Sequence, residues 1–379
     1  MSKSANNQRI VWLDFLRLTA LLMVIAAHSV DIFNATPQQD PVAGFWGVFI
    51  GSLMRPSVPL FAMMTGLLLL PIKESAGEFY RKRIPRVAIP MVLWSVIYYL
   101  IPWLTGVLGF EGSIISILFP FEFSPSQEAG DMLRNIAMIP LGFNGYTTHM
   151  WYIYMLIGLY LAMPFFSAWI EKNDKTLIRT FIIMWGCSLL LPYLGQVISP
   201  DILGVCAWNE FGTLYYFAGF AGYLLLGHLM RKGTPLPSRK IVAVGAMLYF
   251  AGYIVTYSGY ATMAAQYSYA EAPDKLELFW QFCSPNVALM ALGLFMIAHR
   301  VKINSEKTKA ILEKTTKCSF GVYLMHYIFI GPIIILLSPL NLPTPICVIL
   351  TVAMVYAICY GITAAIYHIL PKAARYIVG

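Results

Sequence analysis

Charged residues are scarce in this sequence: they make up 12% of its 379 residues, whereas hydrophobic residues reach 59% and the mean hydropathy is +0.68. Soluble domains carry roughly a quarter of their residues as charged side chains. Acids are rarest within the long apolar stretches, where Asp14 is the one that lies well inside. This shortage excludes an ordinary soluble protein and predicts a polytopic membrane protein.

Other signals are also missing. The six cysteines form no CxxC pair and no metal-ligand spacing, so we predict no metal site and assign them no role. Asp14 and Arg17 interrupt the first apolar stretch, which argues against a cleaved signal peptide and for a retained first span. Without a repeat, a low-complexity tract or a soluble catalytic domain, residues 1–379 are expected to form a single membrane domain.

Apolar stretches of about 20 residues each predict an all-α bundle of about ten transmembrane helices. They lie near residues 10–32, 44–71, 84–108, 149–170, 176–198, 211–231, 239–259, 281–300, 318–338 and 344–370. The longest connection, about residues 109–148, is expected outside and mixes Glu122, Glu128 and Asp131 with apolar residues. A loop of that length is either a connector or a functional surface segment, here one that lines an entrance for a polar acceptor.

The basic residues predict the orientation of these spans. With the N-terminus inside, all but four of the 26 lysines and arginines fall in alternate, inner segments, as cytoplasmic loops require. The exceptions are Arg134 and Lys275 outside, and Arg17 and Arg55 within spans. Both termini are therefore expected on the cytoplasmic side of the membrane. The net charge of +8 then reflects orientation in the membrane and not binding to nucleic acid.

The first span carries a polar stripe. A helix turns about 100° per residue, which puts Arg17 and His28 within about 20° of one face and Asp14 within about 60° of both. Asp14 and Arg17 are predicted to neutralise each other, which structure alone would explain. His28 is a candidate general base. About 16 Å of helix separates Arg17 from His28, so they must serve different parts of one long ligand or different events.

Other polar positions allow a structural and a functional reading. Arg55 adjoins two prolines in the second span and either accompanies a packing kink or faces a cavity. The inner segment with Arg81, Lys82, Arg83 and Arg86 either records topology and contact with anionic membrane lipids or holds the phosphates of a nucleotide-type donor.

At the outer mouth of the fourth span lie His149, Trp151 and Tyr152. His149 is a candidate for an acceptor site, while an aromatic residue such as Trp151 is usually interfacial. On the ninth span, Tyr323 and His326 lie three residues apart on one face and need polar partners, through either a structural hydrogen bond or catalysis.

Taken in order, these motifs resemble the membrane acyltransferase-3 family. The resemblance rests on an R-x10-H signature at Arg17 and His28, on Ser57 to Gly66 with its flanking prolines, and on Arg83-x-x-Arg86. It continues through His149 to Tyr152, Tyr160 to Pro164 and Ser319 to His326, and so covers nearly the whole chain. In layout the chain is most similar to stand-alone O-acetyltransferases of surface polysaccharides, such as the one that modifies enterobacterial common antigen.

The resemblance implies transfer of an acyl group, acetyl being favoured, from cytoplasmic acyl-CoA to a hydroxyl of a lipid-linked or polymeric glycan beyond the outer leaflet. His28 would act as general base or transient acyl carrier, and Arg17, with Asp14 beside it, would position the donor. Arg83, Arg86 and Lys82 would bind the CoA phosphates of acetyl-CoA. Candidates for contact with the acceptor are His149, Trp151, Tyr152, Arg55, Tyr323 and His326.

A transporter or flippase for a lipid-linked sugar is the alternative, because prolines and buried ionisable residues within ten spans also suit alternating access. The lack of a visible inverted repeat and the shortage of intramembrane acids count against it.

Overall fold

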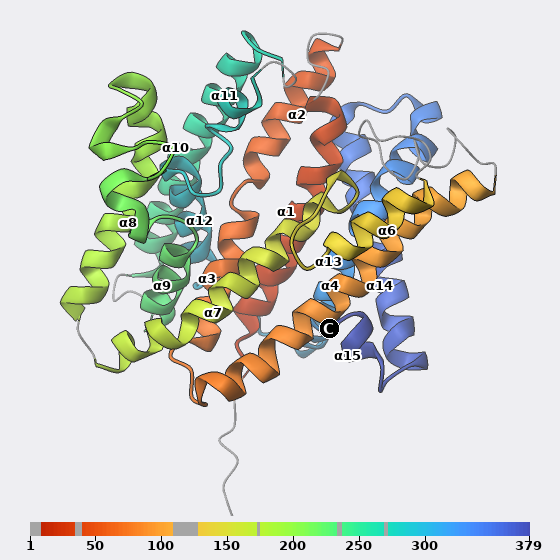
Figure 1. Cartoon of the computed structure of the whole chain (residues 1–379), viewed down its shortest axis with the longest axis horizontal. Helices are drawn as coiled ribbons and strands as arrows, with labels where there is room; N and C mark the ends of the chain where they lie inside the picture. The colour runs from red at the N-terminus through yellow and green to blue at the C-terminus, as the bar shows by residue number, and fades with distance from the viewer. Residues whose placement is uncertain (1–8, 35–39, 109–127, 173–174, 233–236, 269–271) are drawn as a thin grey trace, which may run out of the picture.

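The computed structural model describes residues 9–34, 40–108, 128–172, 175–232, 237–268 and 272–379. In these residues the secondary structure is helical, and the one extended pairing is an isolated bridge between Cys206 and Asn209. The prediction of an all-α polytopic membrane bundle is confirmed (Figure 1).

Long helices make up most of the bundle. They are α1 (Val11–Asn34), α4 (Ala76–Val107), α7 (Trp151–Glu171), α8 (Lys175–Val197), α10 (Ser238–Ala264), α13 (Glu306–Leu337) and α14 (Thr344–Ile369). The shorter α-helices are α2 (Pro41–Met54), α3 (Ser57–Leu69), α6 (Ala129–Met138), α9 (Ala221–Leu229), α11 (Pro273–Glu277), α12 (Pro285–Ala298) and α15 (Ala374–Ile377). Five 3₁₀ turns connect them: η1 (Gly145–Met150), η2 (Ile202–Gly204), η3 (Gly212–Phe217), η4 (Met230–Lys232) and η5 (Ser338–Leu340).

Eight helical stretches in the described part of the chain are long and apolar enough to cross a membrane, counting α2 and α3 together. The sixth and eighth predicted spans correspond to shorter elements. In the sixth, Gly212 and Gly219 adopt positive φ angles of 50° and 85°, which leave the right-handed helix, so only α9 is α-helical there. The eighth is α12, with 14 residues. The count of ten spans thus stays a prediction.

Helix α1 lies at the centre of the bundle. It packs against α2, α3, α12, α13 and α14, and its apolar residues Leu21 and Ile25 are almost fully buried in the main core (Figure 1). A polar side chain on such a helix faces protein and not lipid. Central placement of α1 therefore brings its stripe of Arg17 and His28 to the interior of the molecule.

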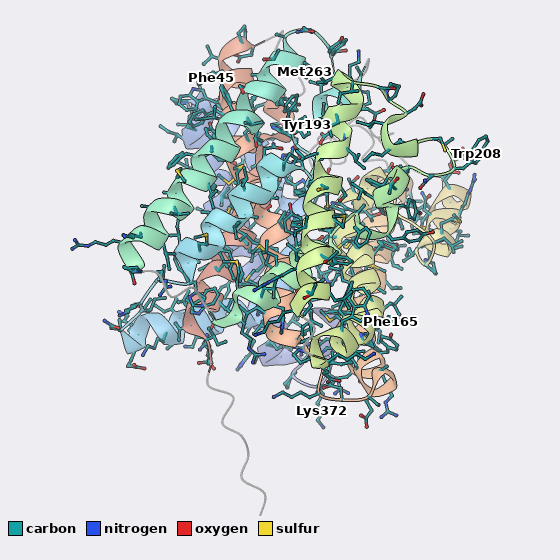
Figure 2. All side chains as sticks on the ribbon, turned by 90° about the vertical axis from the view of Figure 1, so that its left-hand side faces the viewer. Phe45, Phe165, Tyr193, Trp208, Met263 and Lys372 are labelled. Atoms are coloured by element: carbon teal, nitrogen blue, oxygen red, sulfur yellow. The ribbon has the colours of Figure 1, made fainter. Side chains whose placement is uncertain are left out.

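The surface of the bundle is apolar where lipid is expected. Phe165 on α7, Ile254 on α10 and Ile349 on α14 are 69%, 62% and 66% exposed. Figure 2 shows Phe165 pointing away from the bundle, with Phe45 near one end of the molecule and Lys372 near the other. Exposed aliphatic and aromatic side chains over this area are typical of a face that contacts acyl chains.

Candidate active site

Three histidines that are far apart in the sequence meet inside the bundle. The ring of His326 on α13 lies 5.4 Å from the ring of His28 on α1 and 5.4 Å from the ring of His149 on η1. Tyr327 contacts two of them, with ring distances of 5.4 Å to His28 and 5.1 Å to His149. The structure thus joins His28 with two residues predicted to contact the acceptor. We call His28, His149, His326 and Tyr327 the histidine cluster.

His28 has a carboxylate partner that the sequence analysis missed. Its Nδ1 atom lies 3.1 Å from Oδ2 of Asp31, three residues further along α1. An ionised carboxylate only accepts hydrogen bonds, so in a neutral imidazole paired with it Nδ1 carries the proton and Nε2 has the lone pair. The i, i+3 spacing on one helix face was a signal that could have identified this pair.

Accessibility distinguishes the three imidazoles. The His28 side chain is 23% exposed, whereas residues His149 and His326 are 1% and 0% exposed. His28 is therefore the most exposed histidine of the cluster.

Buried nitrogens in the cluster are left without partners. Nδ1 of His326 donates to the carbonyl of Tyr323 at 2.6 Å, but its Nε2 has no hydrogen-bond partner among the described residues. Neither ring nitrogen of His149 has one there, although the ring lies near the backbone of Leu324. Tyr323 donates its hydroxyl to the carbonyl of His149, which ties α13 to η1. Unsatisfied buried nitrogens are costly and are satisfied when a polar ligand binds.

A second polar group lies toward the other end of α1. Tyr160 on α7 interacts electrostatically with Arg17, Arg83 and Arg86. Arg17 and Arg86 also interact electrostatically with each other. Arg17 forms no hydrogen bond or ion pair with any residue that the structure describes, and the buried Nε of Arg83 lacks a partner there. We call Arg17, Arg83, Arg86 and Tyr160 the arginine cluster. Three guanidinium groups gathered around Tyr160 form a site suited to an anion.

The other basic candidates of this region make different contacts. Arg86 donates to the carbonyl of Gly379 at 3.2 and 3.4 Å, which places α15 beside α4. Lys82 lies 3.6 Å from the carboxylate of Glu74 and is largely exposed. Lys82 therefore lies at the margin of the arginine cluster.

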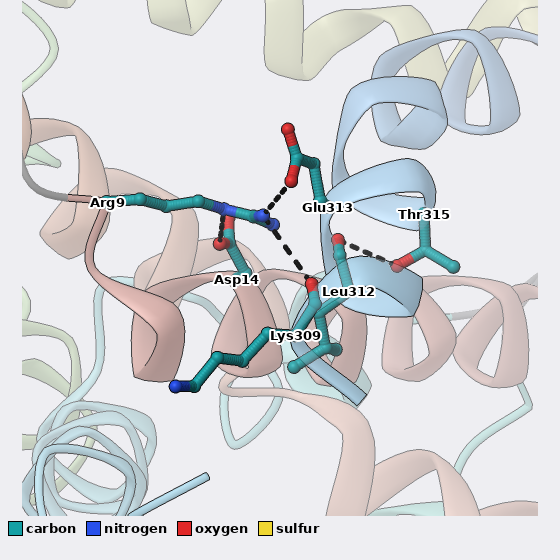
Figure 3. Close-up of polar contacts among 6 residues, drawn as sticks. All are labelled: Arg9, Asp14, Lys309, Leu312, Glu313 and Thr315. Carbon is teal, nitrogen blue, oxygen red and sulfur yellow. Dashed lines mark hydrogen bonds and ion pairs between the residues drawn. The ribbon is translucent and has the colours of Figure 1, made fainter. Parts of the chain in front are cut away.

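Asp14 and Arg17 do not form the predicted direct ion pair, although the two side chains interact electrostatically. Asp14 Oδ2 instead accepts from Nε of Arg9 at 2.6 Å, and Nη1 of Arg9 contacts Glu313 on α13 at 2.7 Å (Figure 3). Arg9 precedes α1, and Arg17 interacts electrostatically with Asp14, Tyr152 and Tyr160. Arg9 thus connects Asp14 at the start of α1 to Glu313 on α13.

Arg55 lies where the second predicted span breaks between α2 and α3. Its guanidinium is 3.8 Å from the ring centre of Trp280 and 5.8 Å from that of Phe282. Phe282 in turn stacks on Trp151, with ring centres 5.4 Å apart. Cation–π contact of this kind holds Arg55 inside the protein, so it does not extend toward solvent.

Aromatic side chains connect the two clusters. Tyr152 lies within electrostatic range of Arg17 and Tyr160, and its ring is 5.5 Å from that of Tyr323. Tyr323 is 5.7 Å from His326 and 6.1 Å from His149, measured between ring centres. Tyr152 and Tyr323 therefore form a continuous row from the arginine cluster to the histidine cluster.

These observations define a polytopic membrane protein with two internal polar clusters, the arginine cluster and the histidine cluster, at different positions along α1. Over residues 10–364 the chain matches the model of the acyltransferase-3 family, whose description is "Acyltransferase domain". Since the match covers nearly the whole chain, the protein belongs to this family and is a membrane acyltransferase. No curated protein and no solved structure matches the chain, so its likeness to the enzyme of enterobacterial common antigen stays a prediction.

Proposed function

We propose that the protein transfers an acetyl group from cytoplasmic acetyl-CoA to a hydroxyl of a lipid-linked or polymeric cell-surface glycan at the outer side of the bacterial inner membrane. The observation that carries this proposal is the pair of clusters on α1, one cationic and one built on the His28–Asp31 pair, connected through Tyr152 and Tyr323. A donor with phosphates at one end and a thioester at the end of a long thin arm suits this arrangement.

The arginine cluster supports binding of the CoA phosphates. Arginine binds phosphate oxygens through two parallel hydrogen bonds, and such charge-assisted bonds are roughly twice as strong as neutral ones. Arg83 and Arg86 lie in the N-terminal part of α4, on the side that the distribution of basic residues assigns to the cytoplasm, where acetyl-CoA is found. Arg17 lies further inside the bundle and positions the donor. Lys82 adds a positive charge at the edge of the arginine cluster.

His28 carries the chemistry in this proposal. Its Nε2 takes the proton of the acceptor hydroxyl, the oxygen attacks the thioester carbonyl carbon, and the bond from carbon to sulfur breaks. The proton then passes from Nε2 to the leaving thiolate, which gives free CoA. Asp31 fixes the tautomer and stabilises the imidazolium that forms between these two steps. Attack by Nε2 itself, with a transient acetyl-imidazole, needs the same tautomer.

The acceptor side of the reaction is formed by the remaining residues of the histidine cluster and its neighbours. His149 and His326 offer unpaired ring nitrogens to hydroxyl groups of the glycan. Tyr152 and Tyr323 lie between the histidine cluster and the arginine cluster, where the donor is proposed to bind. Phe282 contacts both Trp151 and Arg55, which lie beside this region. The roles of these residues in binding the acceptor are part of the proposal.

Donor binding is the direct test of this function. Calorimetry on the purified full chain in detergent should detect acetyl-CoA binding, and an Arg83→Ala/Arg86→Ala double variant should weaken it by about a hundredfold, or roughly 2.8 kcal/mol. Arg81→Ala is the matched control, because Arg81 is exposed on the same turn of α4 and has no contact with Tyr160. Folded wild-type protein that binds no acetyl-CoA would contradict the proposal and favour a transporter of lipid-linked sugar.

A further inference from the structure

A polar cavity of about 730 Å³ lies beside α6, which Figure 1 shows next to α4. Its lining includes Tyr99 on α4, Glu128, Asp131 and Arg134 on α6, and Phe143 and Tyr146 beyond it. The volume falls within the roughly 300–1,000 Å³ that is usual for sites of small ligands. None of these lining residues belongs to the histidine cluster or the arginine cluster.

The chemistry of the lining is suited to a sugar. The side chains of Glu128, Asp131 and Arg134 line the cavity and make no hydrogen bond or ion pair with the residues that the structure describes. Carboxylates accept hydrogen bonds from hydroxyls, and a guanidinium donates several in a fixed geometry. The rings of Tyr99, Phe143 and Tyr146 add apolar surface beside these groups, against which the carbon face of a sugar ring packs.

Other ligand classes fit less well. The phosphates of a CoA molecule would meet two carboxylates here, and the arginine cluster lies at the opposite end of α4. An acyl chain would leave three charged side chains without polar partners.

The short element η1 connects the cavity with the histidine cluster. Tyr146, which lines the cavity, and His149, which belongs to the cluster, lie three residues apart in η1, which kinks at Thr147 between them. Two contacts hold η1 in place: the Asn144 side chain caps it, and Thr147 shares a 2.8 Å hydrogen bond with the hydroxyl of Tyr99. The cavity and the histidine cluster are therefore adjacent along the chain.

We infer that this cavity is the binding site for the acceptor saccharide. The inference rests on the proposed acetyl transfer and adds the place and the chemical class of the acceptor: neighbouring sugar units that present hydroxyls to Glu128, Asp131 and Arg134 and a ring face to Tyr146.

A glycine pair provides the test. Gly142 lines the cavity, and a Cβ atom added there meets no atom within 4 Å, so Gly142→Trp fills space in the cavity. Gly130→Trp is the matched control, since Gly130 on α6 also has open space around it and is not part of the lining. Inside-out membrane vesicles from the native host supply the acceptor, radiolabelled acetyl-CoA supplies the donor, and calorimetry on each purified variant reports acetyl-CoA binding.

The expected result is that Gly142→Trp lowers label transfer to glycan by about tenfold or more while acetyl-CoA affinity stays within about twofold. Gly130→Trp should leave both at the wild-type level. Equal transfer by the two variants would overturn the inference and leave the proposed function intact. Wild-type protein that fails to bind acetyl-CoA would instead overturn the proposed function.

A second variant keeps the test decisive if Gly142→Trp does not fold. Asp131→Asn/Arg134→Gln removes charge from the cavity without adding bulk, and Glu210→Gln, an exposed acid of another outer connection, is its control. The double variant should raise the KM for the glycan about tenfold with little change in donor affinity. An unchanged KM would overturn the inference.

Discussion

At the scale of single residues, the account depends on the different environments of three histidines. His28 is accessible and paired with Asp31, whereas His149 and His326 are buried beside it with unpaired nitrogens. Imidazole with a carboxylate on Nδ1 and a free Nε2 is arranged for proton transfer. Chemistry is therefore assigned to His28, and acceptor contacts to the other two.

Asp31→Asn tests the positioning role of Asp31. The amide keeps the shape and can still accept a hydrogen bond from Nδ1, but it no longer stabilises a positive imidazolium, so kcat should fall by about a hundredfold. Acetyl-CoA affinity should stay unchanged, and Asp31→Glu should restore part of the rate. Asp201→Asn, in an exposed outer turn, is the control. Wild-type kcat in Asp31→Asn would show that the carboxylate plays no part in the reaction.

The sequence allowed part of this site to be predicted. Helical spacing placed Arg17 and His28 on one face of a central helix, and the polar positions of His149 and His326 indicated interior roles. It did not reveal the partner of Asp14, because the Arg9 side chain that binds it is anchored by Glu313, about 300 residues away. Such contacts depend on tertiary packing, which local spacing does not determine.

At the scale of helices, two glycines set the contact between α3 and α9. A Cβ atom on Gly66 would lie 1.8 Å from the carbonyl oxygen of Leu224, and one on Gly227 would lie 1.9 Å from that of Met63. The two backbones thus touch at reciprocal positions, as small residues permit between membrane helices. Gly66 ends the proline-flanked motif of the second span, so that motif has a packing role.

Substitution of Gly66 should destabilise the protein severely. In Gly66→Ala the methyl group meets backbone, which cannot rotate away, and the expected loss is at least the roughly 1–3 kcal/mol of an overpacked core. Gly158→Ala on α7 is the control, since a Cβ atom there has open space. Thermal unfolding in detergent, followed by loss of the monodisperse peak in size-exclusion chromatography, measures the difference. Equal midpoints for the two variants would contradict the close approach of α3 and α9.

Apolar length predicted the long helices well but not the broken ones. The second predicted span divides at Arg55 and Pro56, and the sixth begins with turns at Gly212 and Gly219. The hydrophobicity of a segment indicates that it is buried in lipid or in protein. Where the helix breaks within that segment depends on glycine and proline. Helix breaks inside a membrane protein are tolerated where other parts of the protein surround them, as Trp280 and Phe282 surround Arg55.

At the scale of the whole molecule, the two ends of the bundle differ in charge. The start of α1, the start of α13, Arg86 and Gly379 lie at one end, joined by the contacts of Arg9 with Glu313 and of Arg86 with Gly379. Most basic residues belong to the segments predicted to lie at this end. The proposed reaction needs that end in the cytoplasm, because the donor is cytoplasmic and the acceptor is outside.

Cysteine labelling tests this orientation. Cys206 is free and exposed in the connection after α8, so a membrane-impermeant maleimide should label it in spheroplasts. In a Cys206→Ala background, Lys372→Cys should react only after the membrane is permeabilised. The reverse pattern would place the arginine cluster outside and contradict the proposed direction of transfer.

The role of His28 in acyl transfer is tested by label transfer with a His28→Ala variant. Vesicles with equal amounts of wild-type protein, His28→Ala and the exposed control His368→Ala receive radiolabelled acetyl-CoA, and the label in glycan is counted. The account predicts that His28→Ala loses about 10²- to 10⁴-fold in transfer rate, the range for removal of a general base, while acetyl-CoA still binds and His368→Ala is unaffected. Transfer at the wild-type rate by folded His28→Ala would contradict it.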